Sequence, residues 1–108
     1  MTERAYRDKL TAASQSLGVY RAEFTRTRSR LAKLYVMMEA IWREYTAAED
    51  PATRAALEDR YGKLSDRALS CEKALGLTAE SLRKIREDAF QVQQEDVLTK
   101  TLRMIRSG

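Results

Sequence analysis

Apolar residues recur at helical spacing along the chain, and the widest apolar stripe lies between residues 21 and 48. No Gly or Pro interrupts this stretch, so we predict one long helix from Arg21 to about Ala48, roughly 28 residues or about 42 Å. Its apolar band, roughly 100° wide or more, must be covered by other segments or by other copies of the chain. The seam residues of this helix are Phe24, Leu31, Leu34, Tyr35, Met38, Ile41, Trp42 and Tyr45.

A second apolar stripe follows at alternating steps of four and three residues, which is typical of a coiled-coil seam. We predict a helix from Pro51 to Leu75, with Asp50 as its N-cap and Pro51 at the first position, where no amide donor is needed. The linker of about five residues forces the two long helices to lie antiparallel. The seam residues of this second helix are Leu57, Tyr61, Leu64, Ala68, Cys71 and Leu75.

Shorter segments flank the two long helices. We predict an N-terminal helix within residues 1–18, capped by Thr2 and closed by Gly18 in the left-handed conformation. At the other end, Gly76 is the expected C-cap of the hairpin, and Thr78 is the expected N-cap of the helix that follows.

The C-terminal segment, residues 77–108, is either one helix to about Arg106 or two pieces hinged near Gln93, where the stripe is weak. The predicted fold class is therefore all-α. A long antiparallel helical hairpin, residues 19–76, forms the oligomerisation core of a single helical domain of 108 residues, with shorter flanking N- and C-terminal helices.

Composition predicts the cellular compartment of the protein and excludes an internal disulfide. Cys71 is the only cysteine, so no internal disulfide is possible, and we expect it to be a small core residue. No signal peptide and no apolar run near 18 residues is present, so we expect a cytoplasmic protein with no membrane partner.

The residues that most enzymes use are missing. The chain has no histidine, no Gly-rich phosphate loop and too few cysteines for a zinc site. Neighbouring acidic residues occur in pairs, but adjacent positions on a helix diverge by about 100° and do not converge on one point. We therefore expect no catalytic residues, no metal and no cofactor.

Charge is distributed unevenly around a formal net charge of +4. Residues 21–33 are strongly basic, residues 39–60 are mainly acidic, and the C-terminus is basic again. Arg26, Arg30 and Lys33 fall at i, i+4 and i+7, so they share one helix face, as a strip that meets DNA phosphates requires. An ordinary solvated face with salt-bridge partners remains the alternative. The candidate DNA-binding residues are Arg21, Arg26, Arg28, Arg30, Lys33, Lys100, Arg103 and Arg106.

Short motifs accompany this order of elements. The first half contains Leu17-Gly18-Val19-Tyr20, Glu23-Phe24 and, near the end of the long helix, Trp42-Arg43-Glu44-Tyr45. The second half contains Leu75-Gly76-Leu77-Thr78, followed by Ser81-Leu82-Arg83-Lys84-Ile85. Over roughly residues 10–88 the chain resembles phage terminase small subunits, whose signature is Leu-Gly-Leu-Thr-Pro. Ala79 stands where that family usually has Pro, and the linker at residues 46–50 is shorter than is usual there.

The resemblance implies a non-catalytic component of viral DNA packaging. Such a protein forms a homo-oligomeric ring through its helical hairpin, binds double-stranded DNA and recruits the large ATPase–nuclease subunit in the host-cell cytoplasm. The ring contacts would use the apolar surface left over from the hairpin, together with the acidic middle of one subunit against a basic neighbour.

Two other classes remain open. The first is a helical protein–protein interaction module, such as an adaptor, antitoxin or inhibitor, that binds no nucleic acid. The second is a transcriptional regulator with a helix-turn-helix whose turn is Leu75–Thr78. The helix after that turn carries Glu80 and the pair Glu87-Asp88, and acidic residues near the start of a recognition helix oppose DNA phosphates.

Overall fold

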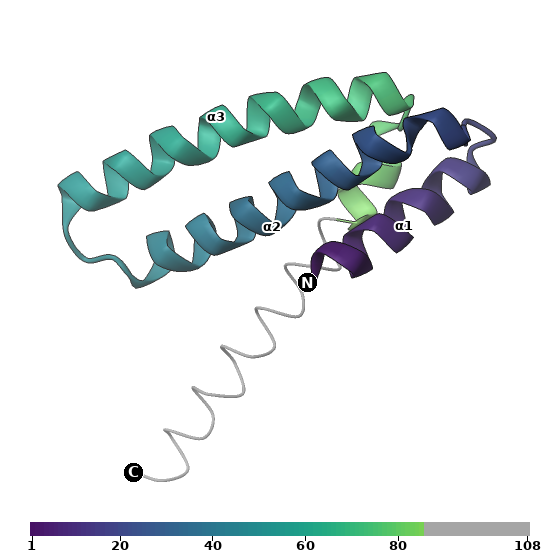
Figure 1. Cartoon of the computed structure of the whole chain (residues 1–108). Helices are drawn as coiled ribbons and strands as arrows, with labels where there is room; N and C mark the ends of the chain where they lie inside the picture. The colour runs from purple at the N-terminus through teal and green to yellow at the C-terminus, as the bar shows by residue number, and fades with distance from the viewer. Residues whose placement is uncertain (86–108) are drawn as a thin grey trace, which may run out of the picture. The chain divides into compact units, whose positions relative to one another are not determined.

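The computed structural model describes residues 1–85, and it is helical throughout apart from short connections (Figure 1). In chain order the elements are α1 (Glu3–Ser16), a 3-10 turn η1 (Ala22–Phe24), α2 (Thr25–Ala47) and α3 (Pro51–Leu75). A further helix begins at residue 79 and continues through residue 85. The predicted all-α fold, a long α2–α3 hairpin with shorter flanking helices, is confirmed.

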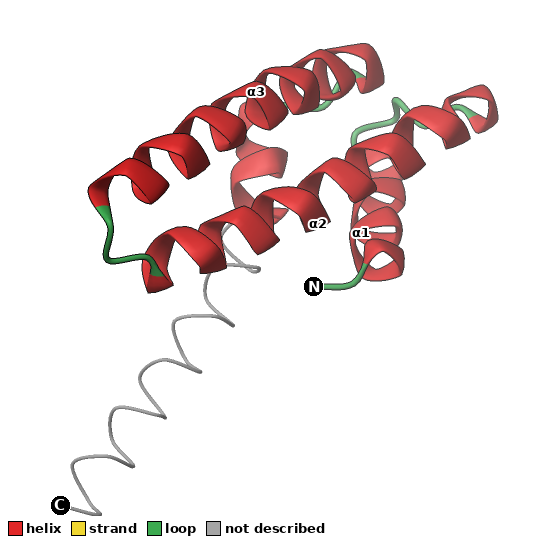
Figure 2. Cartoon of the chain, turned by 60° about the vertical axis from the view of Figure 1, so that its left-hand side comes forward, coloured by secondary structure: helices red, strands yellow, loops and turns green. Residues whose placement is uncertain are grey.

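The central element of the hairpin is α2, which contacts both of its neighbours. It packs against α3 along its length, and α1 packs against its N-terminal half (Figures 1 and 2). The N-terminal end of α1 lies near the middle of α2, and the C-terminal end of α1 leads through a short connection to the start of α2. Two different faces of α2 are therefore covered.

The bounds of α3 agree with the prediction because local capping determines both ends. The Asp50 carboxylate accepts hydrogen bonds from the Thr53 amide at 3.0 Å and from the Thr53 hydroxyl at 2.8 Å. The hydroxyl bond is the main reason why the pKa of Asp50 is lowered. At the other end, Gly76 has a φ of 71°, and its N–H is donated to the carbonyls of Glu72 and Lys73.

The first helix also begins and ends as predicted, within one residue. The Thr2 hydroxyl oxygen accepts the Ala5 amide at 3.1 Å, and the helix extends from Glu3 to Ser16. Gly18 follows with a φ of 71°. Its amide and that of Val19 are donated back to carbonyls of the last helical turn, so the chain can reverse directly after α1.

The start of α2 differs from the predicted start at Arg21. Arg21 is extended, with φ −139° and ψ 131°, and a 3-10 turn precedes the α-helix, which begins at Thr25. The Arg28 side chain donates a hydrogen bond to the Arg21 carbonyl at 3.0 Å. The Thr25 hydroxyl donates another to the Ala22 carbonyl at 2.6 Å. These side-chain bonds satisfy backbone carbonyls that a continuous helix would use.

The core lies along both covered faces of α2. Tyr35 is the residue at which the three helices meet, because its ring lies 5.2 Å from that of Tyr6 and its hydroxyl donates to Glu72 at 2.8 Å. Cys71 is buried, as predicted for a core residue. The buried apolar residues of the three helices are Tyr6, Leu10, Leu31, Ala32, Leu34, Tyr35, Met38, Ile41, Leu57, Leu64, Ala68, Cys71 and Leu75.

The chain divides into two compact units, Met1–Leu77 and Thr78–Gly108. In the second unit the Thr78 hydroxyl oxygen accepts the Ser81 amide at 3.2 Å, so Thr78 is the predicted N-cap. The alternative hinge near Gln93 and the basic residues Lys100, Arg103 and Arg106 lie outside the described residues. No helix within residues 1–85 is long and apolar enough to cross a membrane.

Candidate nucleic-acid interface

Three of the predicted DNA-binding residues lie together on the uncovered face of α2. Arg26, Arg30 and Lys33 are all exposed, and their spacing of four and three residues places them on one side of the helix. We call these three residues the α2 basic row. Within residues 1–85 none of them forms an ion pair or a side-chain hydrogen bond. Their charges therefore face solvent unneutralised by the rest of that part of the chain.

Arg28 lies on a different face and is only 4% exposed. Its guanidinium donates hydrogen bonds to the Arg21 carbonyl at 3.0 Å and to the Thr25 hydroxyl at 3.2 Å, and it lies 4.6 Å from the centroid of the Tyr20 ring. Arg28 was predicted to bind DNA with its neighbours, but its burial separates it from the exposed Arg26 and Arg30. Its position two residues after Arg26 turns it by about 200°, towards α1.

Arg21 is exposed but lies before the helix, in extended backbone. Its carbonyl accepts hydrogen bonds from both Arg28 and Phe24. Its side chain therefore starts from a separate segment, close in sequence to the α2 basic row but outside its helical spacing.

A polar groove lies between α1 and the start of α2, and it includes two cations that were not among the predicted DNA-binding residues. Arg4 and Arg7 of α1 line it together with the buried Arg28, in a space of about 330 Å³. Asp8 contributes the one carboxylate of the lining. The signal for this groove was the i, i+3 spacing of Arg4 and Arg7, which places both on one face of α1.

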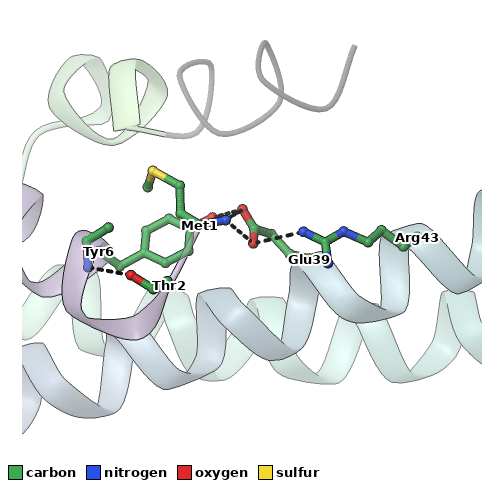
Figure 3. Close-up of polar contacts among 6 residues, drawn as sticks. Met1, Thr2, Tyr6, Glu39 and Arg43 are labelled. Atoms are coloured by element: carbon green, nitrogen blue, oxygen red, sulfur yellow. Dashed lines mark hydrogen bonds and ion pairs between the residues drawn. The ribbon is translucent and has the colours of Figure 1, made fainter. Parts of the chain in front are cut away.

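A second buried polar cluster holds the other end of α1 against α2 (Figure 3). The Glu39 carboxylate is 8% exposed and accepts hydrogen bonds from the Met1 amino group at 2.9 and 2.7 Å. The Tyr6 hydroxyl donates to the same carboxylate, and Arg43 approaches it at 3.9 Å. Burial, followed by the hydrogen bond to Glu39, raises the pKa of Tyr6 far above its ordinary value of 10.0.

An aromatic pocket of about 230 Å³ lies near the loop end of the hairpin. Trp42 stacks on Tyr45 at a centroid distance of 5.7 Å and lies 6.1 Å from Tyr61 of α3. The Arg54 guanidinium lies over the Tyr45 ring, 4.5 Å from its centroid. Trp42 is 38% exposed, so this part of the predicted seam is open to solvent rather than closed by the hairpin.

The remaining seam residues divide by exposure. Leu31, Leu34, Tyr35, Met38, Ile41, Leu57, Leu64 and Leu75 are buried, whereas Phe24, Tyr45 and Tyr61 are half-buried. Two large apolar side chains outside the predicted seam, Met37 and Leu69, are 49% and 48% exposed. In the described part of the chain, no group of three or more cysteine and carboxylate side chains is placed to hold a metal ion.

Comparisons of the whole chain with protein-family profiles, with curated proteins and with solved structures found no match.

Proposed function

We propose that this chain is a non-catalytic DNA-packaging protein of the terminase small-subunit type. In this proposal the hairpin assembles into a homo-oligomer, the uncovered face of α2 binds double-stranded DNA, and the assembly recruits a large ATPase–nuclease subunit. The support for the family is the set of motifs in the sequence and the order of the helices. The support for DNA binding is the α2 basic row.

The position of the α2 basic row is the main support for DNA binding. Both packing faces of α2 are occupied by α1 and α3, yet this third face holds three cations without an acidic partner among residues 1–85. From Arg26 to Lys33 the row rises by about 10 Å, which matches about three phosphates of one DNA strand along the duplex axis. A row of this kind binds the backbone without reading the bases.

The test is a triple neutralisation of Arg26, Arg30 and Lys33 to Gln. We expect weaker binding to duplex DNA of any sequence, and a slope of log affinity against log salt that is smaller by about 2.5 to 3, because about 0.9 counterions are released per phosphate contact. Fluorescence anisotropy of a labelled duplex at several salt concentrations measures both quantities. Circular dichroism checks that the helices are retained.

A matched control removes the same charge from the other helix of the hairpin. Arg60, Arg67 and Lys73 are exposed on α3, so their triple replacement by Gln changes the net charge equally but leaves the α2 basic row intact. An equal loss of DNA affinity in both triple variants would show that the effect comes from net charge alone and not from the α2 basic row. Unchanged binding in the α2 variant would exclude the row as the DNA contact.

The aromatic pocket favours a second candidate function, a protein–protein interaction module without nucleic acid. Partly exposed Trp and Tyr side chains are the residues that most often anchor a protein interface. If the purified chain binds no duplex DNA at low salt, this second function becomes the better one. Replacing Trp42 by Ala then tests the interaction module, because a protein partner that binds the wild-type chain should no longer bind the variant.

A further inference from the structure

We propose that the groove between α1 and the start of α2 is a binding site for a phosphate group, and that it takes a backbone phosphate of the DNA that lies on the α2 basic row. This inference rests on the proposed function for the source of the phosphate. The phosphate chemistry itself comes from the lining of the groove.

The first observation is the state of Arg28. Its guanidinium is charged at any physiological pH, and the residue is 4% exposed. Its hydrogen bonds within residues 1–85 go to neutral oxygens, the Arg21 carbonyl and the Thr25 hydroxyl, and no carboxylate there pairs with it. The Tyr20 ring, 4.6 Å away, stabilises the cation in part but carries no opposite charge, so a site next to Arg28 favours an anion.

The second observation concerns the charged residues that line the groove together with Arg28. Arg4 and Arg7 approach from α1, so three cations face one carboxylate, Asp8, and the local charge is positive. Neither Arg4 nor Arg7 forms an ion pair with another described residue. The Ser29 hydroxyl, also in the lining, supplies a donor from α2.

The third observation is the fit of phosphate to this lining. A planar guanidinium group can donate to two oxygens of a phosphate at once, and the groove lining contains three such groups from two helices. The space of about 330 Å³ is large enough for a phosphate group.

The position of the groove next to the α2 basic row points to the DNA backbone as the source. Ser29 belongs to the groove lining, and Arg26 and Lys33 stand three and four residues away from it on the same helix. In this proposal the strand that follows the row also reaches the edge of the groove at Ser29, whereas Arg28 lines the side that faces α1. One phosphate seated there would fix the register of α1 and α2 on the duplex.

The first experiment uses inorganic phosphate as the probe, with chloride at matched ionic strength as the reference. The full chain is compared with Arg7→Gln, which changes an exposed groove residue, and with Arg30→Gln, which removes the same charge from the α2 basic row outside the groove. We expect phosphate to raise the melting temperature of the wild type and of Arg30→Gln, and to raise that of Arg7→Gln much less. No stabilisation of the wild type by phosphate would overturn the site.

The second experiment measures duplex DNA affinity of the same variants by fluorescence anisotropy. Loss of one charge-assisted contact predicts about tenfold weaker binding for Arg7→Gln. Asp8→Asn removes the opposing carboxylate and is expected to bind more tightly than the wild type. If phosphate stabilisation depends on Arg7 but DNA affinity does not, the site takes free phosphate and the backbone assignment is overturned.

These outcomes separate the groove from the proposed function. Failure of the groove leaves Arg7→Gln with wild-type DNA affinity while the α2 triple variant still loses binding. Failure of the proposed function leaves both variants, and the wild type, without duplex binding at low salt.

Discussion

At the scale of single residues, the Tyr6 hydroxyl and the Glu39 carboxylate form the contact with the clearest energetic consequence. Tyr6 is 3% exposed and Glu39 is 8% exposed, so both groups have lost most of their water. The Glu39 carboxylate accepts hydrogen bonds from the Tyr6 hydroxyl and from the Met1 amino group, which replace part of the hydration that it has lost. Each donor that is removed leaves a buried charge less well solvated.

Replacing Tyr6 by Phe tests this contact. We expect the free energy of unfolding at pH 7 to fall by about 1.5–3 kcal/mol, the range for a hydrogen bond to a charged group. Because the pKa of Tyr6 is raised in the folded state, the unfolded chain releases this proton first as the pH rises. The contribution is therefore complete below pH 10 and is lost above it, by at most about 1.4 kcal/mol per pH unit.

Urea unfolding of both proteins between pH 7 and pH 11 measures the difference. The gap between wild type and Tyr6→Phe should be constant up to about pH 9 and should narrow above pH 10. A gap that stays constant through pH 11 would show that Tyr6 ionises equally in the folded and unfolded chains.

At the scale of elements, two glycines of the hairpin show opposite uses of the same residue. Gly62 lies inside α3, and a Cβ placed there would meet no atom within 4 Å. Gly76 ends α3 with a φ of 71°, a conformation that residues with an L side chain adopt only with strain. Backbone conformation, rather than space, is what requires glycine at the end of the helix.

The two alanine substitutions therefore form a matched pair. Gly62→Ala should stabilise the fold by about 0.5–1 kcal/mol, because alanine loses less backbone entropy in a helix interior. Gly76→Ala should destabilise it by about 1–2 kcal/mol because of the left-handed φ. Thermal unfolding compares them directly. A destabilising Gly62→Ala in the assembled protein would indicate that another subunit approaches the backbone at this position.

The ends of the helices show which features the sequence could predict. Caps are local, so Thr2, Asp50, Gly76 and Thr78 were sufficient to place helix ends. The start of α2 was predicted four residues too early, because it depends on the Arg28 side chain reaching back to the Arg21 carbonyl. Side-chain competition for a backbone carbonyl leaves no mark in apolar periodicity.

The candidate site likewise has a part that the sequence could predict and a part that it could not. Helical spacing alone placed Arg26, Arg30 and Lys33 on one face, because all three belong to one element. The groove needs the register of α1 on α2, which brings Arg4 and Arg7 to Arg28, and no pattern within either helix encodes that register. The stripe of Arg28, Ala32, Tyr35 and Glu39 was the available hint, since these buried residues recur at steps of four, three and four beside the main seam.

At the scale of the whole molecule, the question is what the hairpin leaves uncovered. Leu69 of α3 is 48% exposed, Met37 of α2 is 49% exposed and Trp42 is 38% exposed. Single exposed apolar residues are common on monomeric proteins, so exposure alone does not establish an interface. Three of them on the two helices of one hairpin, together with the open aromatic pocket, favour association between copies.

Light scattering after gel filtration, at low and high salt, measures the mass of the assembly. We expect one closed oligomer larger than a dimer, as symmetric head-to-tail contacts produce. Leu69→Glu should reduce it to smaller species with unchanged helicity, because a charge would be buried at the contact. Leu17→Glu is the matched control, since Leu17 is 38% exposed but lies at the end of α1, outside the hairpin.

Salt separates the two forces that would hold such an assembly. Contacts between the acidic residues 39–60 of one subunit and basic residues of the next should weaken as the Debye length falls, whereas apolar contacts should persist. A mass that falls at high salt therefore assigns the contact to charge, and a mass that depends only on Leu69 assigns it to the apolar surface. A monomer or dimer under both conditions would contradict the ring and leave the α2–α3 hairpin as a module for a different partner.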